Sequence, residues 1–451
     1  MSGGSHQNRR NCHADGICLP ARAIIGQMET RTLPSTLPAD SSINEQGHLV
    51  LGGCDAVDLA REFGTPAYVM VESELRERAD RFLKALAATG MKGTIKYASK
   101  ACPVVEVGKI FSSMGLGCDV TSGGELRIAL LGGFAPEDIL FHGNAKSEAD
   151  LNDIFEHKVG LVAIDNADEV ATIAARAREA GVIQKVLLRV TPGVTGDTIA
   201  AVSTGQEDSK FGVNLPDAPA VIEAIQNEDS LELRGLHLHV GSQLGDTGSI
   251  ARAAAAIAPL GDFPVVNLGG GLGVGYLDGS PDGDIEEFVA GAAAAAAEHF
   301  GPDVELMLEP GRALVATAGV TLYSVETVKS NVSTYVAVDG GISDNLRPLA
   351  YGSAYMALSA DRVNDQPDTP CRVVGKHCES GDQIATEASL PAPKRGDLVA
   401  VPVTGAYGHA MANNYNGALR PPVLMVEGGK ARVAVRRETW DDLLARETAG
   451  N

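Results

Sequence analysis

Residues 93–125 read GTIKYASKACPVVEVGKIFSSMGLGCDVTSGGE, and this stretch decides the fold. An apolar run at Gly93–Ala98 precedes a stretch with helical spacing at Val104–Met114, and a second apolar run follows at Leu116–Val120. Two short apolar runs on either side of a helical pattern predict a strand, a crossover helix and a second, parallel strand. We therefore expect one β-α-β unit here.

The same alternation of apolar run and helical pattern continues to about residue 318. Several runs are continuously apolar, which is typical of strands buried on both faces. Eight such strands over roughly 220–240 residues predict a (β/α)8 barrel, although an open, doubly wound sheet has the same local pattern. The predicted strands are Gly93–Ala98, Leu116–Val120, Asp138–Phe141, Leu161–Ile164, Val186–Val190, Leu233–Val240, Val265–Leu268 and Leu306–Leu308.

Beyond about Val320 the alternation of strand and helix ends, and apolar runs follow one another without long helices between them. Gly428-Gly429 separates the last two runs as a hairpin turn would. We predict a second, mostly antiparallel β domain, which Leu49–Leu51 and Ala67–Val71 join from the N-terminal side. Its other strands are predicted at Tyr335–Val338, Arg372–Val374, Leu398–Val403, Val423–Val426 and Ala431–Val435.

Residues 1–44 are polar and without periodicity, which favours a flexible extension. Cys12-His13 and Cys18 in this segment could be metal ligands, but no second ligand pair follows at zinc-finger spacing. We therefore predict no metal site. The predicted parts are the extension at 1–44, a barrel at 73–318, and a β domain formed by 45–72 with 319–447.

The chain has 451 residues and a formal net charge of −21, from 37 Lys and Arg against 58 Asp and Glu. This balance argues against nucleic acid and anionic membranes as partners. No apolar run approaches the ~18 residues of a membrane span, and residues 1–44 contain no apolar core of a signal peptide. The seven scattered cysteines fit a reducing compartment, so we expect a cytoplasmic protein.

Polar or glycine-rich residues follow nearly every predicted barrel strand. Barrel enzymes carry their catalytic groups on the face formed by the carboxyl ends of the strands, so these residues are expected to meet there. A packing role would not place lysine, aspartate, histidine and glutamate together. The residues are Lys100, Asp119, Ser122–Glu125, His142–Lys146, Arg189, His237–Ser242, Gly269–Gly271 and Glu309–Arg312.

Some of these residues together describe a site for pyridoxal phosphate. A strand-end lysine such as Lys100 can form an imine with an aldehyde. Considered without the other residues, Lys100 would be interpreted as an ordinary surface lysine. Consecutive glycines expose backbone N–H groups to a phosphate, and Arg312 and Ser242 would add a charge and a hydroxyl. Glu309 could pair with a protonated ring nitrogen, and His239 could stack on the ring or equally be a core histidine.

A second cluster lies in the predicted β domain, at His377–Asp382. A cysteine beside a glutamate in a cleft can act as an acid, whereas a buried Cys378 would only pack as a small apolar residue. Arg347, earlier in the chain, could bind a carboxylate through its planar guanidinium. A solvated surface arginine is the simpler alternative for Arg347.

In this order and spacing, the motifs resemble those of the fold-type III pyridoxal-phosphate-dependent decarboxylases, the family of the ornithine, diaminopimelate and arginine decarboxylases. The resemblance runs from about Leu49 to Leu444, is strongest to the members that act on diaminopimelate, and implies an alanine-racemase-like barrel with a β domain. The motifs are Tyr97–Lys100, Asp119–Leu126, Ser203–Gly205 with Ser209–Gly212, His237–Ser242, Gly269–Gly271, Glu309–Arg312, Cys378–Asp382 and Gly405–Tyr407.

The resemblance implies that Lys100 binds the cofactor aldehyde, that His239 stacks on the ring and that Glu309 pairs with its nitrogen. It implies Cys378 as the proton donor, reaching the site from the partner subunit of a homodimer. The implied cofactor-binding residues are Lys100, Asp119, His239, Ser242, Gly269, Gly270, Gly271, Glu309, Gly311, Arg312 and Tyr407. The implied substrate-binding residues are Arg312, Arg347, Tyr351, Glu379 and Tyr407.

Arg312, Arg347 and Tyr351 offer partners for a second carboxylate, which ornithine and lysine lack. The resemblance therefore favours decarboxylation of meso-2,6-diaminopimelate to L-lysine and CO2, the last step of lysine biosynthesis. Cys102 stands where the family commonly has asparagine and suggests an alternative, a decarboxylase of ornithine, lysine or a carboxylated polyamine in specialised metabolism. Two alternatives of other classes are a non-catalytic regulatory homologue and a racemase, which Glu309 disfavours.

Overall fold

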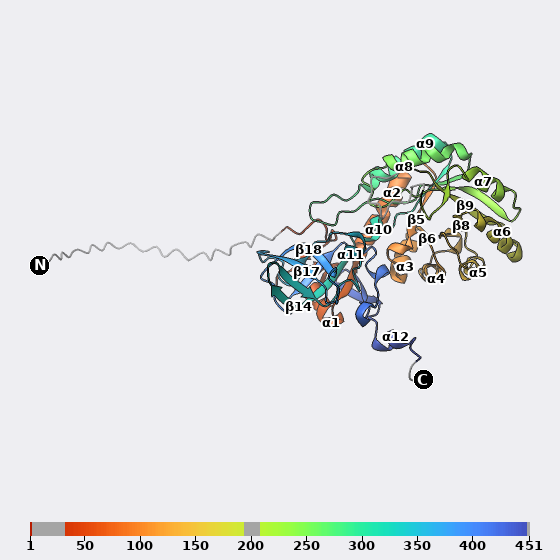
Figure 1. Cartoon of the computed structure of the whole chain (residues 1–451). Coiled ribbons are helices and arrows are strands. Elements are labelled where there is room, and N and C mark those ends of the chain that lie inside the picture. Colours follow the sequence, from red (N-terminus) through yellow and green to blue (C-terminus); the bar gives the residue numbers. More distant parts are fainter. Residues whose placement is uncertain (2–31, 194–207, 449–451) are drawn as a thin grey trace. The chain divides into compact units, whose positions relative to one another are not determined.

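The computed structural model describes residues 32–193 and 208–448, together with Met1. Residues 2–31 of the predicted extension and the Ser203–Gly205 motif therefore lie outside the described residues. From Thr32 onward the chain forms one compact unit that contains two large sheets (Figure 1).

The first sheet is a closed ring of eight parallel strands. Closure is complete because β13 pairs with β5 and β8 pairs with β9, so the barrel prediction is confirmed and the open sheet is excluded. A short strand, β10 (Val213–Asn214), adds to β9 outside the ring. The barrel strands are β5 (Gly93–Ala98), β6 (Gly117–Val120), β7 (Ile139–Phe141), β8 (Leu161–Ile164), β9 (Gln184–Thr191), β11 (Leu231–His237), β12 (Val265–Asn267) and β13 (Glu305–Leu308).

Helices alternate with these strands and surround them (Figure 1). Several begin at a residue whose side chain caps the helix: Ser122 accepts from the Glu125 backbone, and Ser147 forms a reciprocal capping box with Asp150. The helices are α2 (Glu72–Ala88), α3 (Val105–Ser113), α4 (Gly123–Leu131), α5 (Glu148–Glu156), α6 (Asp168–Ala180), α7 (Ala218–Gln226), α8 (Gly248–Ile257) and α9 (Ile285–Phe300).

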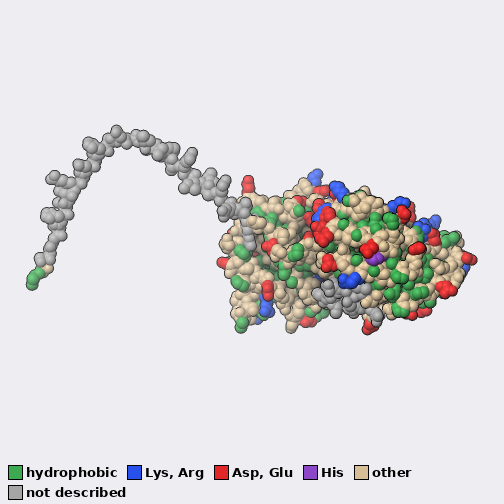
Figure 2. All heavy atoms as spheres, turned by 90° about the horizontal axis from the view of Figure 1, so that it is seen from above, with side chains coloured by type: hydrophobic (Ala, Val, Ile, Leu, Met, Phe, Trp, Pro, Cys, Tyr) green, Lys and Arg blue, Asp and Glu red, His purple; other side chains and the backbone are tan. Residues whose placement is uncertain are grey.

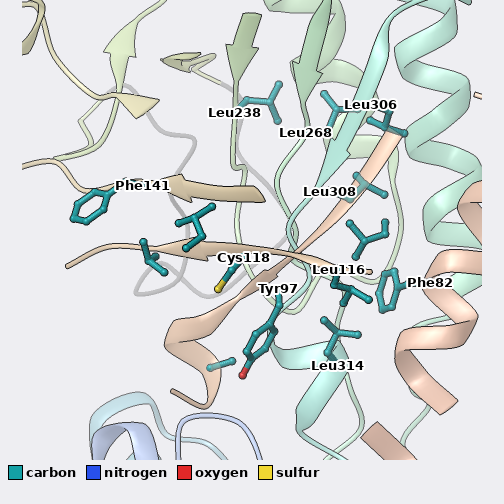
Figure 3. Close-up of a cluster of buried hydrophobic side chains, with 14 of the residues drawn as sticks. Phe82, Tyr97, Leu116, Cys118, Phe141, Leu238, Leu268, Leu306, Leu308 and Leu314 are labelled. Atoms are coloured by element: carbon teal, nitrogen blue, oxygen red, sulfur yellow. The ribbon is translucent and has the colours of Figure 1, made fainter. Parts of the chain in front are cut away.

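Apolar side chains cover both sides of the barrel strands. Ile139 and Phe141 of β7 belong to the large cluster between strands and helices, whereas Leu140 belongs to a separate small cluster with residues of four other strands. Successive side chains of a strand point to opposite faces, so the small cluster fills the barrel interior. Figure 3 shows part of the outer cluster, in which Tyr97 and Phe82 are fully buried.

The second sheet is mixed and mostly antiparallel. Its order is β18-β17-β15-β14-β4-β20-β21, with β19 also on β14, and only β15–β17 and β4–β20 are parallel pairs. The predicted turn is confirmed, because Gly428 and Gly429 have φ of 56° and 77° between β20 and β21. The strands are β4 (Ala67–Val71), β14 (Gly319–Ser330), β15 (Thr334–Val338), β16 (Leu358–Ser359), β17 (Thr369–Val374), β18 (Gln383–Leu390), β19 (Leu398–Pro402), β20 (Val423–Glu427) and β21 (Lys430–Val435).

The prediction of a flexible extension up to residue 44 is wrong for residues 33–44, which contact the rest of the folded chain. Leu37 is buried, and the backbone N–H of Ser35 donates to Asp278 at 3.1 Å. Leu49–Leu51 forms β2 of a separate small sheet, although its side chains share a core with β4. That sheet comprises β1 (Ser42–Ile43), β2 (Leu49–Leu51) and β3 (Cys54–Asp55), and the remaining helices are α1 (Ala56–Phe63), α10 (Arg312–Val315), α11 (Arg347–Tyr351) and α12 (Trp440–Leu444).

Within the described ranges, no helix has both the length and the apolar character that a membrane span requires. Acidic and basic side chains are interspersed over the face seen in Figure 2. Packing between the barrel strands is close, and the contact between β11 and β12 provides a test of that packing.

We expect Gly235→Ala to lower the free energy of unfolding by about 1–3 kcal/mol or more, because overpacking carries that cost. A Cβ at Gly235 of β11 would lie 1.9 Å from the Val265 backbone oxygen of β12. Denaturant unfolding measures the loss. Gly245→Ala is the control, since a Cβ there meets no atom within 4 Å. Equal stabilities of the two variants would contradict the close strand approach.

Candidate active site

A cavity of about 480 Å³ opens at the carboxyl ends of the barrel strands. This volume lies in the range of small-molecule sites. The structure thus brings together most residues that the strand ends predicted, although Gly269 and Gly270 do not line the cavity themselves. Predicted residues that line it are Lys100, Asp119, His239, Ser242, Gly271, Glu309, Gly311, Arg312 and Tyr407.

Lys100 stands in a short turn directly after β5. The Tyr407 backbone N–H donates to the Ala101 oxygen at 2.7 Å, which brings a residue of the β domain to the barrel mouth. Enclosure by protein lowers the pKa of the Lys100 amine, but Tyr407 and the Asp119 carboxylate raise it, and the net shift is upward. The amine therefore has acidic partners in the cavity.

Glu309, after β13, is buried and accepts three hydrogen bonds from the ends of other strands. Asn267 Nδ2 donates to Oε1 at 2.6 Å, His142 Nε2 lies 2.8 Å from Oε1, and His237 Nε2 lies 3.2 Å from Oε2. In the arrangement that satisfies Glu309, both imidazoles carry their proton on Nε2. The carboxylate is thus held in one orientation at the cavity wall.

Burial alone would raise the pKa of Glu309, but its contacts with His142 and His237 outweigh burial and hold the pKa well below the ordinary value. Burial lowers the pKa of His237 to about 4, so this imidazole is neutral near pH 7. Burial also raises the pKa of Asp119 to about 6, against the opposing effect of His142. Of these two buried carboxyl groups, Glu309 therefore stays ionised at a lower pH than Asp119, which gains a proton as the pH falls through about 6.

The three glycines after β12 form a turn that tolerates no side chain. A Cβ would lie 2.1 Å from the Glu309 backbone oxygen at Gly270, and 2.4 Å from the Gly241 oxygen at Gly271. The Gly270 N–H donates to Nδ1 of His239 at 3.3 Å, which orients that imidazole beside the cavity. The position of the His239 imidazole therefore depends on the conformation of the glycine turn.

A second cavity of about 610 Å³ adjoins the first and shares Ser242, Arg312 and Tyr407 with it. The predicted substrate residues Arg347 and Tyr351 line only this second cavity. Arg312 Nη2 donates to Ser242 Oγ at 3.1 Å, so Arg312 lies at the boundary between the two cavities.

Cys378 and Glu379 do not line either cavity, and both are exposed. The Cys378 N–H donates to Asn416 Oδ1 at 3.2 Å, and the Asp382 carboxylate accepts the N–H groups of His377 and Ile342, each at 2.8 Å. These bonds shape the turn that carries the cysteine. One chain alone therefore leaves its predicted proton donor outside the cavities.

Cys102 lies close in sequence to Lys100, but its thiol belongs to the apolar core and is 2% exposed. Burial raises the pKa of this thiol to about 12. Cys102 lines neither cavity, so the alternative that it suggested, a different substrate, gains no support from its position.

Sequence reasoning assigned no role to His142, His237 or Asn267, the three residues that hold Glu309. Their places at strand ends were the available signal, but their shared partner was not visible. His142, His237 and Glu309 have donor atoms within 4.8 Å of one another, as metal ligands would. Each imidazole is instead paired with the carboxylate, and the predicted lack of a metal stays a prediction.

Residues 72–316 match the family model of the pyridoxal binding domain of pyridoxal-dependent decarboxylases. The chain belongs to this family. It is thus a carboxy-lyase that uses pyridoxal phosphate, and the cavity offers the groups such a cofactor requires: a lysine amine, an ionised carboxylate and an arginine. The buried Arg312 Nε has no hydrogen-bond partner among the described residues, so this cation has capacity to bind a further anionic group.

The chain is similar over most of its length to several diaminopimelate decarboxylases. It is 42% identical to that of Bacillus subtilis, covering 90% of this chain and 97% of the relative. It is 45% identical to that of Actinosynnema pretiosum, covering 89% and 93%. The solved diaminopimelate decarboxylase of M. jannaschii in complex with L-lysine superposes with a TM-score of 0.85 at 30% identity, covering 91% and 98%.

We expect Asn267→Asp to weaken the binding of pyridoxal phosphate about 10- to 100-fold, the value of a hydrogen bond to a charged group. The new carboxylate would face Glu309 at the present 2.6 Å contact and raise the pKa of Glu309, which could then no longer hold a protonated ring nitrogen. Absorbance titration of the apoenzyme measures the dissociation constant.

Asn227→Asp is the matched control, because Asn227 is exposed at the end of α7. Unchanged affinity in Asn267→Asp would mean that Glu309 is not the partner of the cofactor ring.

Proposed function

We propose that this chain decarboxylates meso-2,6-diaminopimelate to L-lysine and CO2, the last step of lysine biosynthesis. The observation that carries the proposal is a pair of buried guanidinium groups, Arg312 and Arg347, beside the second cavity. Among the described residues, neither has a carboxylate within ion-pair distance. Buried charges without partners are costly, so these arginines favour a substrate with a carboxylate beyond the one that is lost.

In this proposal, the chain's residues orient the substrate and control protons. Lys100 would hold the cofactor aldehyde through its Nζ, and Glu309 would pair with the protonated ring nitrogen. When bound, pyridoxal phosphate supplies a cationic ring that accepts the electron pair of the broken Cα–carboxylate bond. His239 would lie beside the ring, and the remaining cofactor contacts would be Asp119, Ser242, Gly269, Gly270, Gly271, Gly311, Arg312 and Tyr407.

The substrate's second carboxylate would bind Arg312, Arg347 and Tyr351, near Tyr407. These side chains surround the second cavity, next to the one that Lys100 lines. A substrate that reaches from Lys100 to Arg347 therefore places one end at the reacting centre and the other at the arginines. Ornithine has no anionic group at that end.

We propose further that a homodimer completes the site. Cys378 is exposed and lines neither cavity of its own chain, so its Sγ can donate a proton to Cα only in a partner's site. Glu379 would enter with it and face the substrate amine at the far end. We also propose a cytoplasmic location, since the described cysteines are all free thiols.

The proposal is tested by offering meso-diaminopimelate, L-lysine and L-ornithine in parallel to the purified holoenzyme and measuring CO2 and the amine product. We expect diaminopimelate to be turned over with a kcat/KM at least about 100-fold above the other two, because the unpaired arginines penalise a missing carboxylate. Turnover of ornithine with inert diaminopimelate would refute the proposed substrate.

The shared site is tested by mixing two inactive variants, Lys100→Ala and Cys378→Ala. Each should lose most of its turnover while Cys378→Ala keeps its substrate affinity, because a proton donor acts after binding. Subunit exchange should restore activity, since a mixed dimer contains one site with both native residues. If the mixture stays inactive although mass spectrometry detects mixed dimers, the site is not shared.

A further inference from the structure

Tyr276 contacts both of the unpaired arginines. Its hydroxyl accepts a hydrogen bond from Arg312 Nη1, and its ring centroid lies 5.8 Å from the Arg312 guanidinium carbon and 5.1 Å from that of Arg347. Tyr407 flanks the same two cations, at 4.9 Å and 5.4 Å. Two guanidinium groups thus lie beside two tyrosine rings, and the rings supply attraction that partly offsets the repulsion between the cations.

Tyr276 is itself held firmly. Val274, two residues before it, exchanges two hydrogen bonds with the side chain of Gln243, at 3.0 Å and 3.1 Å. The Asp282 carboxylate accepts the Gly275 N–H at 2.8 Å and forms an ion pair with Arg78 at 3.2 Å. The ring also meets Tyr355 edge-on, with centroids 5.0 Å apart. A ring fixed in this way can impose an orientation on its partners.

The two arginines come from separate parts of the fold. Arg312 begins α10 after the last barrel strand, and Arg347 begins α11 in the β domain. Tyr276 packs against the apolar cores of both parts. The relative placement of the two guanidinium groups therefore depends on a residue that touches each of them.

Tyrosine suits this position because it orients a cation without cancelling its charge. A carboxylate in its place would form an ion pair and leave the arginines less attractive to a substrate anion. A neutral hydroxyl and ring leave the positive charge available. Both arginines are also buried, so water screens that charge weakly.

We propose that Tyr276 is a positioning residue that determines specificity for the substrate's second carboxylate. Its hydroxyl orients Arg312 by accepting a hydrogen bond, and its ring orients Arg347 through a cation–π contact. This inference rests on the proposed function, since it takes the second carboxylate to be that of diaminopimelate. Tyr276 does not touch the reacting bond in this proposal, so its effect falls on binding and not on the chemical step.

The test uses two competitive ligands of the holoenzyme that differ by one group. L-lysine keeps the carboxylate that would bind the arginines, whereas 1,5-diaminopentane has no carboxylate. We expect Tyr276→Phe to weaken L-lysine binding and to raise the KM for diaminopimelate, both about 10-fold or more, because a hydrogen bond to a charged group is lost. Tyr276→Leu, which also removes the ring, should weaken both further.

In both variants, kcat and the dissociation constant of 1,5-diaminopentane should change less than about 3-fold. Tyr335→Phe and Tyr335→Leu are matched controls, since Tyr335 faces Arg372 at 6.0 Å and lines neither cavity. They should leave every constant unchanged.

Equal weakening of L-lysine and 1,5-diaminopentane would overturn the inference and indicate a general structural role. Weakened cofactor binding with unchanged L-lysine binding would overturn it too, because Tyr276 would then orient Arg312 toward the cofactor and not toward the second carboxylate. Calorimetric binding of the two ligands needs no turnover. It therefore still tests Tyr276 if diaminopimelate proves inert, which is the result that defeats the proposed function.

Discussion

The buried carboxylate of Glu309 is the group on which the barrel mouth depends. A lone ionised carboxylate in such a place would cost several kcal/mol, and three donors from the ends of β7, β11 and β12 remove that cost. His142 and Glu309 are 167 residues apart in sequence and meet only because the ring closes. Barrel closure and the ionised state of Glu309 thus support each other.

Several features of the cavity follow from this arrangement. Because β5 lies beside β13, Lys100 stands near a carboxylate that is already ionised. Asp119, on the other side of β5, is held by fewer contacts, and burial raises its pKa to about 6. The site therefore has one permanently charged acid and one whose charge responds to its surroundings. The β domain completes it by placing Tyr407 against the Lys100 turn.

Local pattern was sufficient for the barrel because several of its strands are continuously apolar, and the predicted strands differ from the observed ones by at most three residues at either end. It missed β14 and β18, in which polar residues interrupt the apolar ones. It also misjudged residues 33–44, whose order comes from contacts such as Ser35 with Asp278, 243 residues away. The partners of Glu309 were missed for the same reason: the residue types were visible, but pairings set by closure were not.

Net charge and local charge have opposite signs in this protein. A chain of net charge −21 repels a dicarboxylate, although salt screens that repulsion at distances beyond roughly 10 Å. Attraction must then arise where water is excluded, and there Arg312 and Arg347 lie beside tyrosine rings with no carboxylate paired to them among the described residues. Such cations are costly while the cavity lacks an anion, and an anion that enters removes the cost. Selectivity for a second carboxylate therefore depends on two buried, unpaired cations. The folding free energy of the barrel and the β domain offsets the cost of burying them.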